Sequence, residues 1–181
     1  YVGENLRKVE SFKDMTACLT EATRVIPVAE NSTVELWRHP TKKFGNNLLA
    51  TFDVAIPVVH GTNVEDGTLM GMLEMLNIPY AACDVTASAL GMDKYAMKAV
   101  LRQAGVPVLE ALEYTGREYA VESERVLNEI EEKIGYPAIV KPVNLGSSVG
   151  ISKVRDRQSL LDALDLAVSF SSRVLVERAV E

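Results

Sequence analysis

The stretch Val140–Gly150 reads VKPVNLGSSVG and allows two interpretations that lead to different folds and chemistries. Its last five residues fit the pattern G-x-S-x-G, in which a sharp turn from strand to helix presents a nucleophilic serine. They also fit a loop of small residues whose backbone N–H groups approach a phosphate, with Lys141 adding positive charge from the strand before it. The residues around this stretch decide between acyl transfer from a serine and binding of a phosphate.

The residues that follow Gly150 argue against the nucleophile. The run ISKV at 151–154 is rich in β-branched residues and predicts a strand where the serine turn would need a helix. The catalytic histidine of such hydrolases follows the serine in the chain, whereas His39 and His60 both precede it. We therefore favour phosphate binding, with a surface hairpin and an incidental lysine as the alternative. Neither GxxxxGK[ST] nor GxGxxG occurs, so the sequence predicts no P-loop NTPase and no Rossmann dinucleotide site.

The segments around this stretch predict an α+β unit with an antiparallel hairpin built around the loop. A helix that contains Val100 and Leu101 is expected to end at Gly105 and Pro107, because proline cannot continue a helix. Further along, the pattern predicts helices near 121–134 and 156–170 and strands at 138–142, 150–154 and 173–177. In the helix at 121–134 we expect a solvated glutamate face and an apolar stripe of Leu127, Ile130 and Ile134.

The first half of the chain predicts a parallel β-α-β unit. Residues 52–59, FDVAIPVV, form a continuous apolar run, as expected of a strand that is buried on both faces. A helix is predicted to start at Asp66–Thr68 and to bury Leu69, Met72, Leu73 and Leu76, and IPYAA at 78–82 is the next strand. Ligands gather where parallel strands end, so His60 and Glu65 in the intervening loop are candidate site residues. Residues 13–23 could form a further helix.

The composition is that of a globular protein. The 181 residues are 48% hydrophobic and 24% charged, and no apolar run approaches the roughly 18 residues that a membrane span needs. The net charge of −6 argues against a general nucleic-acid binder. Cys18 and Cys83 have no CxxC spacing and no histidine neighbours, so we expect two buried thiols, no metal or redox site and a cytoplasmic location.

Three segments occur in an order and at a spacing that closely resemble the D-alanine–D-alanine ligases, a family of ATP-grasp carboxylate–amine ligases. They are HGTNVEDGTLMGMLEMLNIPYAACDVTASALGMDK at 60–94, GYPAIVKPVNLGSSVGISKV at 135–154 and RVLVERAV at 173–180. The resemblance covers about residues 50–181. It implies an α/β fold with an incomplete N-terminal pre-ATP-grasp, Rossmann-like domain at 1–91 and an incomplete central ATP-grasp subdomain at 92–181. We therefore expect the chain to be a fragment of such a ligase.

The resemblance also implies roles for particular residues. Lys94 and Lys141 match the two lysines that contact the ATP phosphates, and Gly146–Gly150 match the glycine-rich loop that closes over the triphosphate. Ser147 matches a loop serine that also approaches the substrate side, and Ser148 a phosphate donor. The remaining matches are the adenine-pocket wall Ile139, the hinge residues Glu177, Arg178 and Val180, and the D-alanine neighbours His60 and Glu65.

The family chemistry needs ATP and Mg²⁺, whose ligands are expected beyond Glu181, and it forms D-alanyl-D-alanine through an acyl phosphate for peptidoglycan synthesis. The implied partners are D-alanine and ATP, without nucleic acid or membrane, in a homodimeric full-length protein. The isolated chain is expected to be inactive. The alternatives are a ligase for D-serine or D-lactate, another ATP-grasp ligase, and a non-catalytic nucleotide-binding module.

One position departs from the family pattern. The loop commonly reads HGxxGEDG, whereas Val64 precedes Glu65 in this chain. A valine cannot adopt a positive φ cheaply, so we expect the loop around His60 and Glu65 to have another shape.

Overall fold

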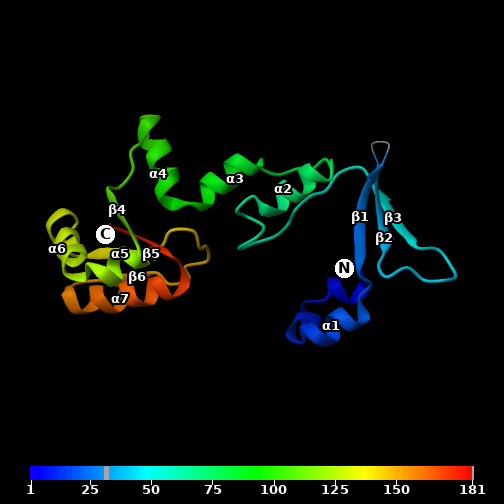
Figure 1. The fold of residues 1–181 in the computed structure, drawn as a ribbon, viewed down its shortest axis with the longest axis horizontal. Coiled ribbons are helices and arrows are strands. Elements are labelled where there is room, and N and C mark those ends of the chain that lie inside the picture. Colours follow the sequence, from blue (N-terminus) through cyan, green and yellow to red (C-terminus); the bar gives the residue numbers. More distant parts are fainter. Residues whose placement is uncertain (31–32, 181) are drawn as a thin grey trace. The chain divides into compact units, whose positions relative to one another are not determined.

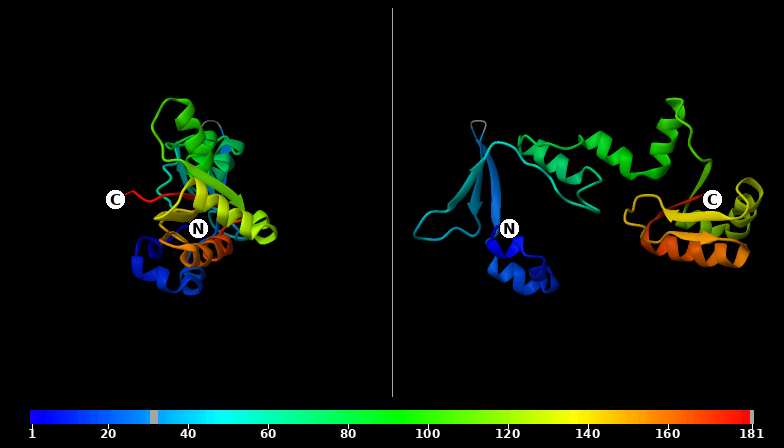
Figure 2. Two further views of the ribbon diagram at one scale, coloured as in Figure 1. Left: turned by 90° about the vertical axis from the view of Figure 1, so that its left-hand side faces the viewer. Right: turned by 180° about the vertical axis from the view of Figure 1, so that it is seen from behind.

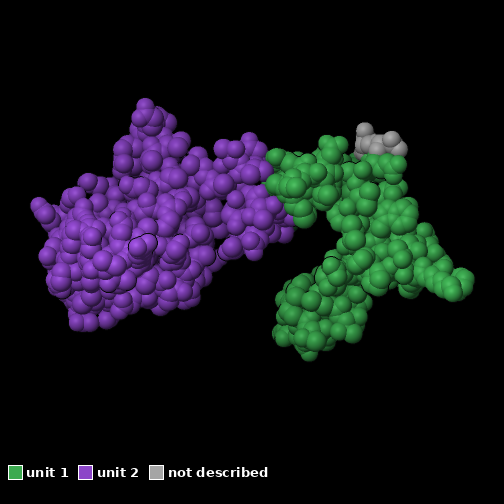
Figure 3. Space-filling model, viewed as in Figure 1, with its two compact units in different colours: residues 1–58, 70–82 green, residues 59–69, 83–181 purple. Residues whose placement is uncertain are grey.

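The computed structural model describes residues 1–30 and 33–180 (Figure 1). The chain divides into two units, one of residues 1–58 and 70–82 and the other of residues 59–69 and 83–181 (Figure 3). Among the described residues no helix is both long enough and apolar enough to cross a membrane.

The first unit is built around a three-stranded antiparallel sheet. Its strands β1 (Val25–Glu30), β2 (Thr33–Arg38) and β3 (Leu48–Phe52) lie in the order β1-β2-β3. Two 3-10 turns, η1 (Glu4–Arg7) and η2 (Val9–Lys13), precede helix α1 (Met15–Glu21), which Asp14 caps by accepting a hydrogen bond from the N–H of Ala17. Helix α2 (Thr68–Met75) begins where the Asp-Gly-Thr signal predicts.

The strand predicted at 52–59 is not formed along its length. Strand β3 ends at Phe52, and beyond it one parallel bridge joins Ala55 to Tyr80, as the β-α-β prediction requires. Apolar side chains on both sides of this bridge are exposed, among them Val54, Ile56 and Val58. A buried strand needs neighbours on both edges and cover on both faces. Beyond Phe52, the one bridge of this run within the described part of its unit is that of Ala55.

The predicted stripe of α2 is also partly wrong. The buried residues of this helix are Met70 and Leu73, whereas Met72 and Leu76 are exposed. Because residues three apart share a helix face, Met70 and Leu73 lie together and turn Met72 outward. The expectation of two buried thiols holds for Cys18 and fails for Cys83, which is exposed.

The second unit contains a four-stranded antiparallel sheet in the order β4-β7-β5-β6. Its strands are β4 (Ala111–Thr115), β5 (Ala138–Pro142), β6 (Ser152–Val154) and β7 (Arg173–Arg178), and its helices are α3 (Val85–Met92), α4 (Lys94–Gln103), α5 (Gly116–Val121), α6 (Ser123–Lys133) and α7 (Arg157–Phe170). The predicted hairpin is present, since β5 pairs with β6 across the loop. Strand β4 and helices α3 and α5 were not predicted.

The core of the second unit fixes which side chains reach the site. Along β5 the buried residues Ala138, Val140 and Pro142 alternate with Ile139 and Lys141, so the two sets point to opposite faces of the sheet. Helix α7, orange in Figure 2, runs along one face of the sheet. There Val140 belongs to the same core as four almost completely buried residues of α6 and α7, Leu127, Ile130, Leu160 and Leu164. The opposite face carries Ile139 and Lys141 beside Glu177 of β7.

Candidate functional site

Helix α4 begins the site by placing two lysines on one face. Asp93 caps the helix, since its carboxylate accepts hydrogen bonds from the N–H groups of Tyr95 at 3.1 Å and Ala96 at 2.9 Å. Lys94 is the first residue of the helix and Lys98 lies four residues on. Side chains at this spacing are neighbours on a helix, so both ammonium groups are carried on the same side of α4.

Glu177 is the carboxylate around which two lysines gather. Its side chain is only 9% exposed; Lys141 of β5 forms a short hydrogen bond to Oε1, and Nζ of Lys98 lies 2.7 Å from Oε2. Burial alone would raise the pKa of Glu177, but its interactions with Lys141 and Lys98 outweigh this and lower the pKa below the ordinary value. The carboxylate is therefore held ionised, and each of its oxygens has its own lysine.

Lys94 is held at the base of the glycine-serine loop. Its Nζ donates to the carbonyl oxygens of Val143 at 3.2 Å and Leu145 at 2.5 Å, and its backbone N–H also donates to Val143. Burial and the nearby charge of Lys141 lower the pKa of Lys94, the first being the larger cause. Since its partners are neutral carbonyls, no carboxylate of the described residues directly contacts the positive charge of Lys94, and an anion would stabilise it.

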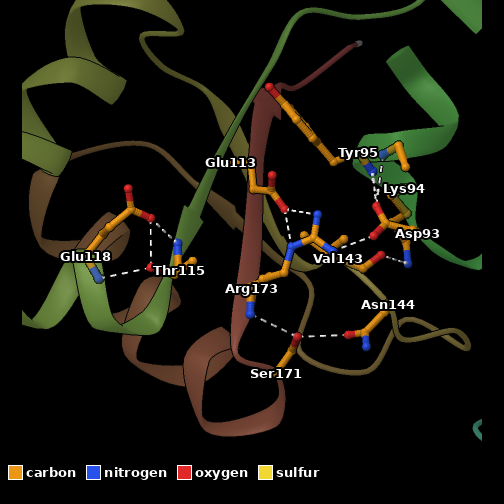
Figure 4. A network of polar contacts seen from close by, with 11 residues as sticks. Asp93, Lys94, Tyr95, Glu113, Thr115, Glu118, Val143, Asn144, Ser171 and Arg173 are labelled. Carbon is orange, nitrogen blue, oxygen red and sulfur yellow. Dashed lines mark hydrogen bonds and ion pairs between the residues drawn. The ribbon is translucent and has the colours of Figure 1, made fainter. Parts of the chain in front are cut away.

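A network of polar contacts fixes the base of the loop against the sheet (Figure 4). Arg173 at the start of β7 forms ion pairs with Asp93, at 2.5 Å, and with Glu113 of β4. The hydroxyl of Ser171 donates to Oδ1 of Asn144 at 2.9 Å. The start of α4, the start of β7 and the residues after β5 are thus tied together, which positions Lys94 relative to Lys141.

The tip of the loop presents donors that have no partner. No hydrogen bond within residues 1–30 and 33–180 engages the backbone N–H groups of Gly146, Ser147 and Ser148 or the two serine hydroxyls. Ser147 and Ser148 have φ values of 52° and 60°, a region that costs a non-glycine residue roughly 1–2 kcal/mol. Strained residues and unpaired donors in an exposed loop are typical of a site that binds an anion.

The same geometry excludes the serine-nucleophile interpretation. The stretch runs from β5 through the loop into β6, and these are antiparallel strands of a hairpin. The element that directly follows the serines is strand β6 and not a helix, so this described segment does not form the strand-to-helix turn that would present a nucleophile.

The loop at 60–67 lies next to the glycine-serine loop. Oε2 of Glu65 accepts a hydrogen bond from the N–H of Gly61 at 2.6 Å, and it would lie 4.0 Å from a Cβ atom at Gly146. Nδ1 of His60 lies 3.9 Å from Oε1 of Glu65, with the imidazole almost fully exposed. Asn63, not Val64, takes the positive φ, at 68°. Asparagine tolerates that left-handed conformation better than valine does.

The remaining sequence candidates lie on strand β5 or on and just after strand β7. Ile139 lies directly opposite Glu177 in the register of β5 and β7. The side chain of Arg178 points away from the Glu177 face and donates from Nη2 to the carbonyl oxygen of Ile134 at 2.8 Å, and Val180 is exposed. Lys98 is the residue that the sequence analysis missed. Its spacing of four residues from Lys94 was the available signal.

Among the residues that the structure describes, no group of three or more histidine, cysteine, aspartate or glutamate side chains could hold a metal ion.

Comparisons with known proteins agree on one family. The model described as "D-ala D-ala ligase N-terminus" matches residues 3–83, and the model described as "D-ala D-ala ligase C-terminus" matches residues 100–181. The D-alanine–D-alanine ligase of Bacillus pumilus is 48% identical over 128 residues, which are 71% of this chain and 36% of that protein. That of Geobacillus kaustophilus is 40% identical over 179 residues, which are 98% of this chain and 47% of that protein.

Solved structures give the same result. The D-alanine-D-alanine ligase of Coxiella burnetii has a TM-score of 0.75 at 28% identity, over 97% of this chain and 48% of that one. The VanG D-Ala:D-Ser ligase of Enterococcus faecalis has a TM-score of 0.76 at 31% identity, over 100% of this chain and 49% of that one. The chain therefore spans half or less of the length of these relatives.

Proposed function

We propose that this chain, which belongs to the D-alanine–D-alanine ligase family, binds ATP as part of an enzyme that joins two D-alanine molecules. Both family models match it, and together they extend over most of its length. The relatives are named for that reaction. The ATP-grasp fold of the family agrees with the mixed helices and antiparallel sheets of this chain.

One observation carries the proposal. The ammonium groups of Lys98 and Lys141 contact one carboxylate, Glu177, and that of Lys94 is close enough to Lys141 for this charge to lower its pKa. The adjoining loop offers N–H donors that have no partner among the described residues. With Arg173, which is paired with Asp93 and Glu113, these groups carry four positive and three negative charges, an excess of one positive charge in a chain whose net charge is −6. A polyphosphate supplies the missing negative charge, and its oxygens match backbone N–H and hydroxyl donors.

In this proposal, the residues of the site bind ATP and orient it for the reaction. ATP supplies the phosphoryl group that activates the carboxylate of the first D-alanine. Lys141 and Lys94 orient the phosphates and offset their charge, and the donors of residues 146–150 fix the phosphoryl oxygens in place. Ile139 offers an apolar wall for the adenine on the same face of the sheet. Ser147, beside the loop that holds His60 and Glu65, would face the D-alanine.

Magnesium has no site among these residues. The carboxylates near the lysines are engaged by cations, Asp93 and Glu113 by Arg173 and Glu177 by two lysines. A divalent ion needs several free oxygen ligands, which the described residues do not bring together. We therefore assign no step of the reaction to a metal held by this part of the chain.

ATP binding is the direct test. We expect the chain to bind ATP in isothermal titration calorimetry, and Lys141→Ala to weaken the binding at least about 10-fold because a charge-assisted contact to phosphate is lost. Lys133→Ala is the matched control, since Lys133 is an exposed lysine paired with Glu129 on α6, and it should leave the affinity unchanged. Equal affinity in the unaltered chain, Lys141→Ala and Lys94→Ala would contradict ATP binding at this site.

A second candidate is a ligase that takes D-serine as the second substrate, because VanG, a D-Ala:D-Ser ligase, is among the structural neighbours. The two are separated by replacing the matched segment of the Geobacillus kaustophilus ligase with this chain, since the match extends over 98% of it. The chimaera should form D-alanyl-D-alanine from ATP and D-alanine in preference to D-alanyl-D-serine. Preference for D-serine would favour the second candidate, and loss of product in its Lys141→Ala variant would link the activity to this site.

A further inference from the structure

We infer that Lys98 is a positioning residue for nucleotide binding. It stays paired with the carboxylate of Glu177, so that Lys141 can leave Glu177 and contact the phosphates. This inference rests on the proposed function, because it assigns Lys141 to a phosphate of ATP. Lys98 itself has no contact with the nucleotide in this scheme and acts through Glu177.

The contacts of the two lysines differ in a way that suggests different roles. Lys98 is held twice, by Oε2 of Glu177 at 2.7 Å and by the carbonyl oxygen of Leu109 at 3.2 Å. Lys141 has Glu177 as its one partner among the described residues, through the other oxygen, Oε1. Both side chains are nearly buried, 12% and 16% exposed. A lysine fixed at two points stays in place, whereas a lysine fixed at one can exchange its carboxylate for another anion.

The position of Glu177 makes a second cation necessary. Its side chain is 9% exposed, so the carboxylate has almost no access to water. A buried carboxylate that loses its ion partner is strongly destabilised unless another cation or a proton neutralises it. If Lys141 engages a phosphate, Lys98 is the cation that still contacts Glu177. Lys98 thus lets the site receive an anion without leaving an unpaired charge in the sheet.

This mechanism predicts that loss of Lys98 affects the binding of ATP and of adenosine differently. Adenosine carries no phosphate, so Lys141 remains with Glu177 when adenosine binds, and loss of Lys98 affects the free and bound states alike. ATP draws Lys141 toward its phosphates, and without Lys98 the carboxylate would then have to take up a proton. A merely structural role of Lys98 would instead weaken the binding of both ligands to the same extent.

The experiment compares Lys98→Met with the unaltered chain by titration calorimetry with ATP and with adenosine, in two buffers of different ionisation enthalpy. We expect Lys98→Met to lose about 10- to 100-fold in ATP affinity and less than about 3-fold in adenosine affinity. ATP binding to this variant should be accompanied by proton uptake that the unaltered chain does not show. Lys98→Arg should restore ATP affinity, and Lys133→Met is the exposed control on α6.

If the single variant fails to fold, the double variant Glu177→Gln with Lys98→Met still tests the inference, because it removes both buried charges. In the Glu177→Gln background, Lys98→Met should cost no further ATP affinity. Equal losses for ATP and adenosine, or no proton uptake, would overturn the inference while leaving ATP binding intact. Failure of the unaltered chain to bind ATP would instead overturn the proposed function, and with it the role of Lys98.

Discussion

Residues 138–142 and residues 52–59 are both apolar runs, and they differ in how many neighbours they have. Strand β5, at 138–142, pairs with β6 on one edge and β7 on the other, and α7 covers one of its faces. Beyond Phe52, the run at 52–59 has a single parallel bridge, at Ala55, to the described residues of its unit. Val140 in the first run is fully buried, and Val58 in the second is 84% exposed. Burial of an apolar strand is therefore a property of its partners as much as of its own residues.

The largest expected difference comes from shortening the same side chain in each run. Val140→Ala should lower the free energy of unfolding by about 2 to 3 kcal/mol, because it removes two buried methyl groups and leaves a cavity. Val58→Ala should change it by less than about 0.5 kcal/mol, since the side chain is already solvated. Urea unfolding followed by circular dichroism measures both. Equal losses would mean that the second run is buried as well.

One glycine near each run has a positive φ value, so the two glycines provide a second comparison. Gly150 (φ 69°) lies where the loop returns to β5, and a Cβ atom there would come within 2.9 Å of Pro142 and 3.0 Å of Phe170. Gly61 (φ 91°) follows the run at 52–59, and a Cβ atom there would have no atom of the described residues within 4 Å apart from its chain neighbours. Alanine at either site should cost about 1 kcal/mol of backbone strain, and at Gly150 about 1 kcal/mol more from overpacking.

The melting temperatures of Gly150→Ala and Gly61→Ala therefore isolate the packing contribution, because the strain is common to both. Gly150→Ala should have the lower melting temperature of the two. An equal decrease in both variants would show that the loop does not pack against β5 and α7.

The smallest expected effect concerns a pair of aspartates. Burial alone would raise the pKa of Asp93, but hydrogen bonds from the Ala96 N–H and from Arg173 outweigh it and keep the pKa below the ordinary 3.8. Because the ionised form is favoured in the folded state, its stabilisation is present above pH 3.8 and is lost as the pH falls below it. Asp93→Asn should thus lower the free energy of unfolding by about 1 kcal/mol at pH 7 and by less at acidic pH.

Asp66, in the loop after the run at 52–59, is the comparison residue. Hydrogen bonds from the backbone N–H groups of Asn63 and Thr68 also lower its pKa, but it has no ion pair among the described residues and is solvated. Asp66→Asn should have the smaller effect, below about 0.5 kcal/mol at pH 7. A pH titration of unfolding for both variants checks the order, and a reversed order would show that the Arg173 contact adds no stability.

Much of the second unit could be predicted from the sequence. Strands at Ala138–Pro142 and Arg173–Arg178 and the stripe of Leu127 and Ile130 follow from local patterns that the tertiary structure preserves. The failures occur where a local pattern lacks support from distant residues. Val54, Ile56 and Val58 have strand composition without strand partners, and Met72 and Leu76 are apolar without a surface to cover them.

The candidate site shows the same limit. Lys94, Lys141 and the glycine-serine loop stand in recognisable motifs, so their grouping could be expected. Lys98 could not, because its importance comes from Glu177 at the far end of the chain and from the burial of both side chains. The positive φ of Asn63 also follows from loop geometry that single-residue preferences only suggest.

The order of strands in the second sheet has a consequence for how the protein is made. Strand β7 lies between β4 and β5, although it is the last of the four along the chain. A ribosome delivers β4, β5 and β6 first, and β4 has no partner until residues 173–178 have left the exit tunnel. Until then the apolar edge of β5 and the whole of β4 are open to other strands. Until β7 inserts, these open strand edges therefore favour aggregation of the nascent chain.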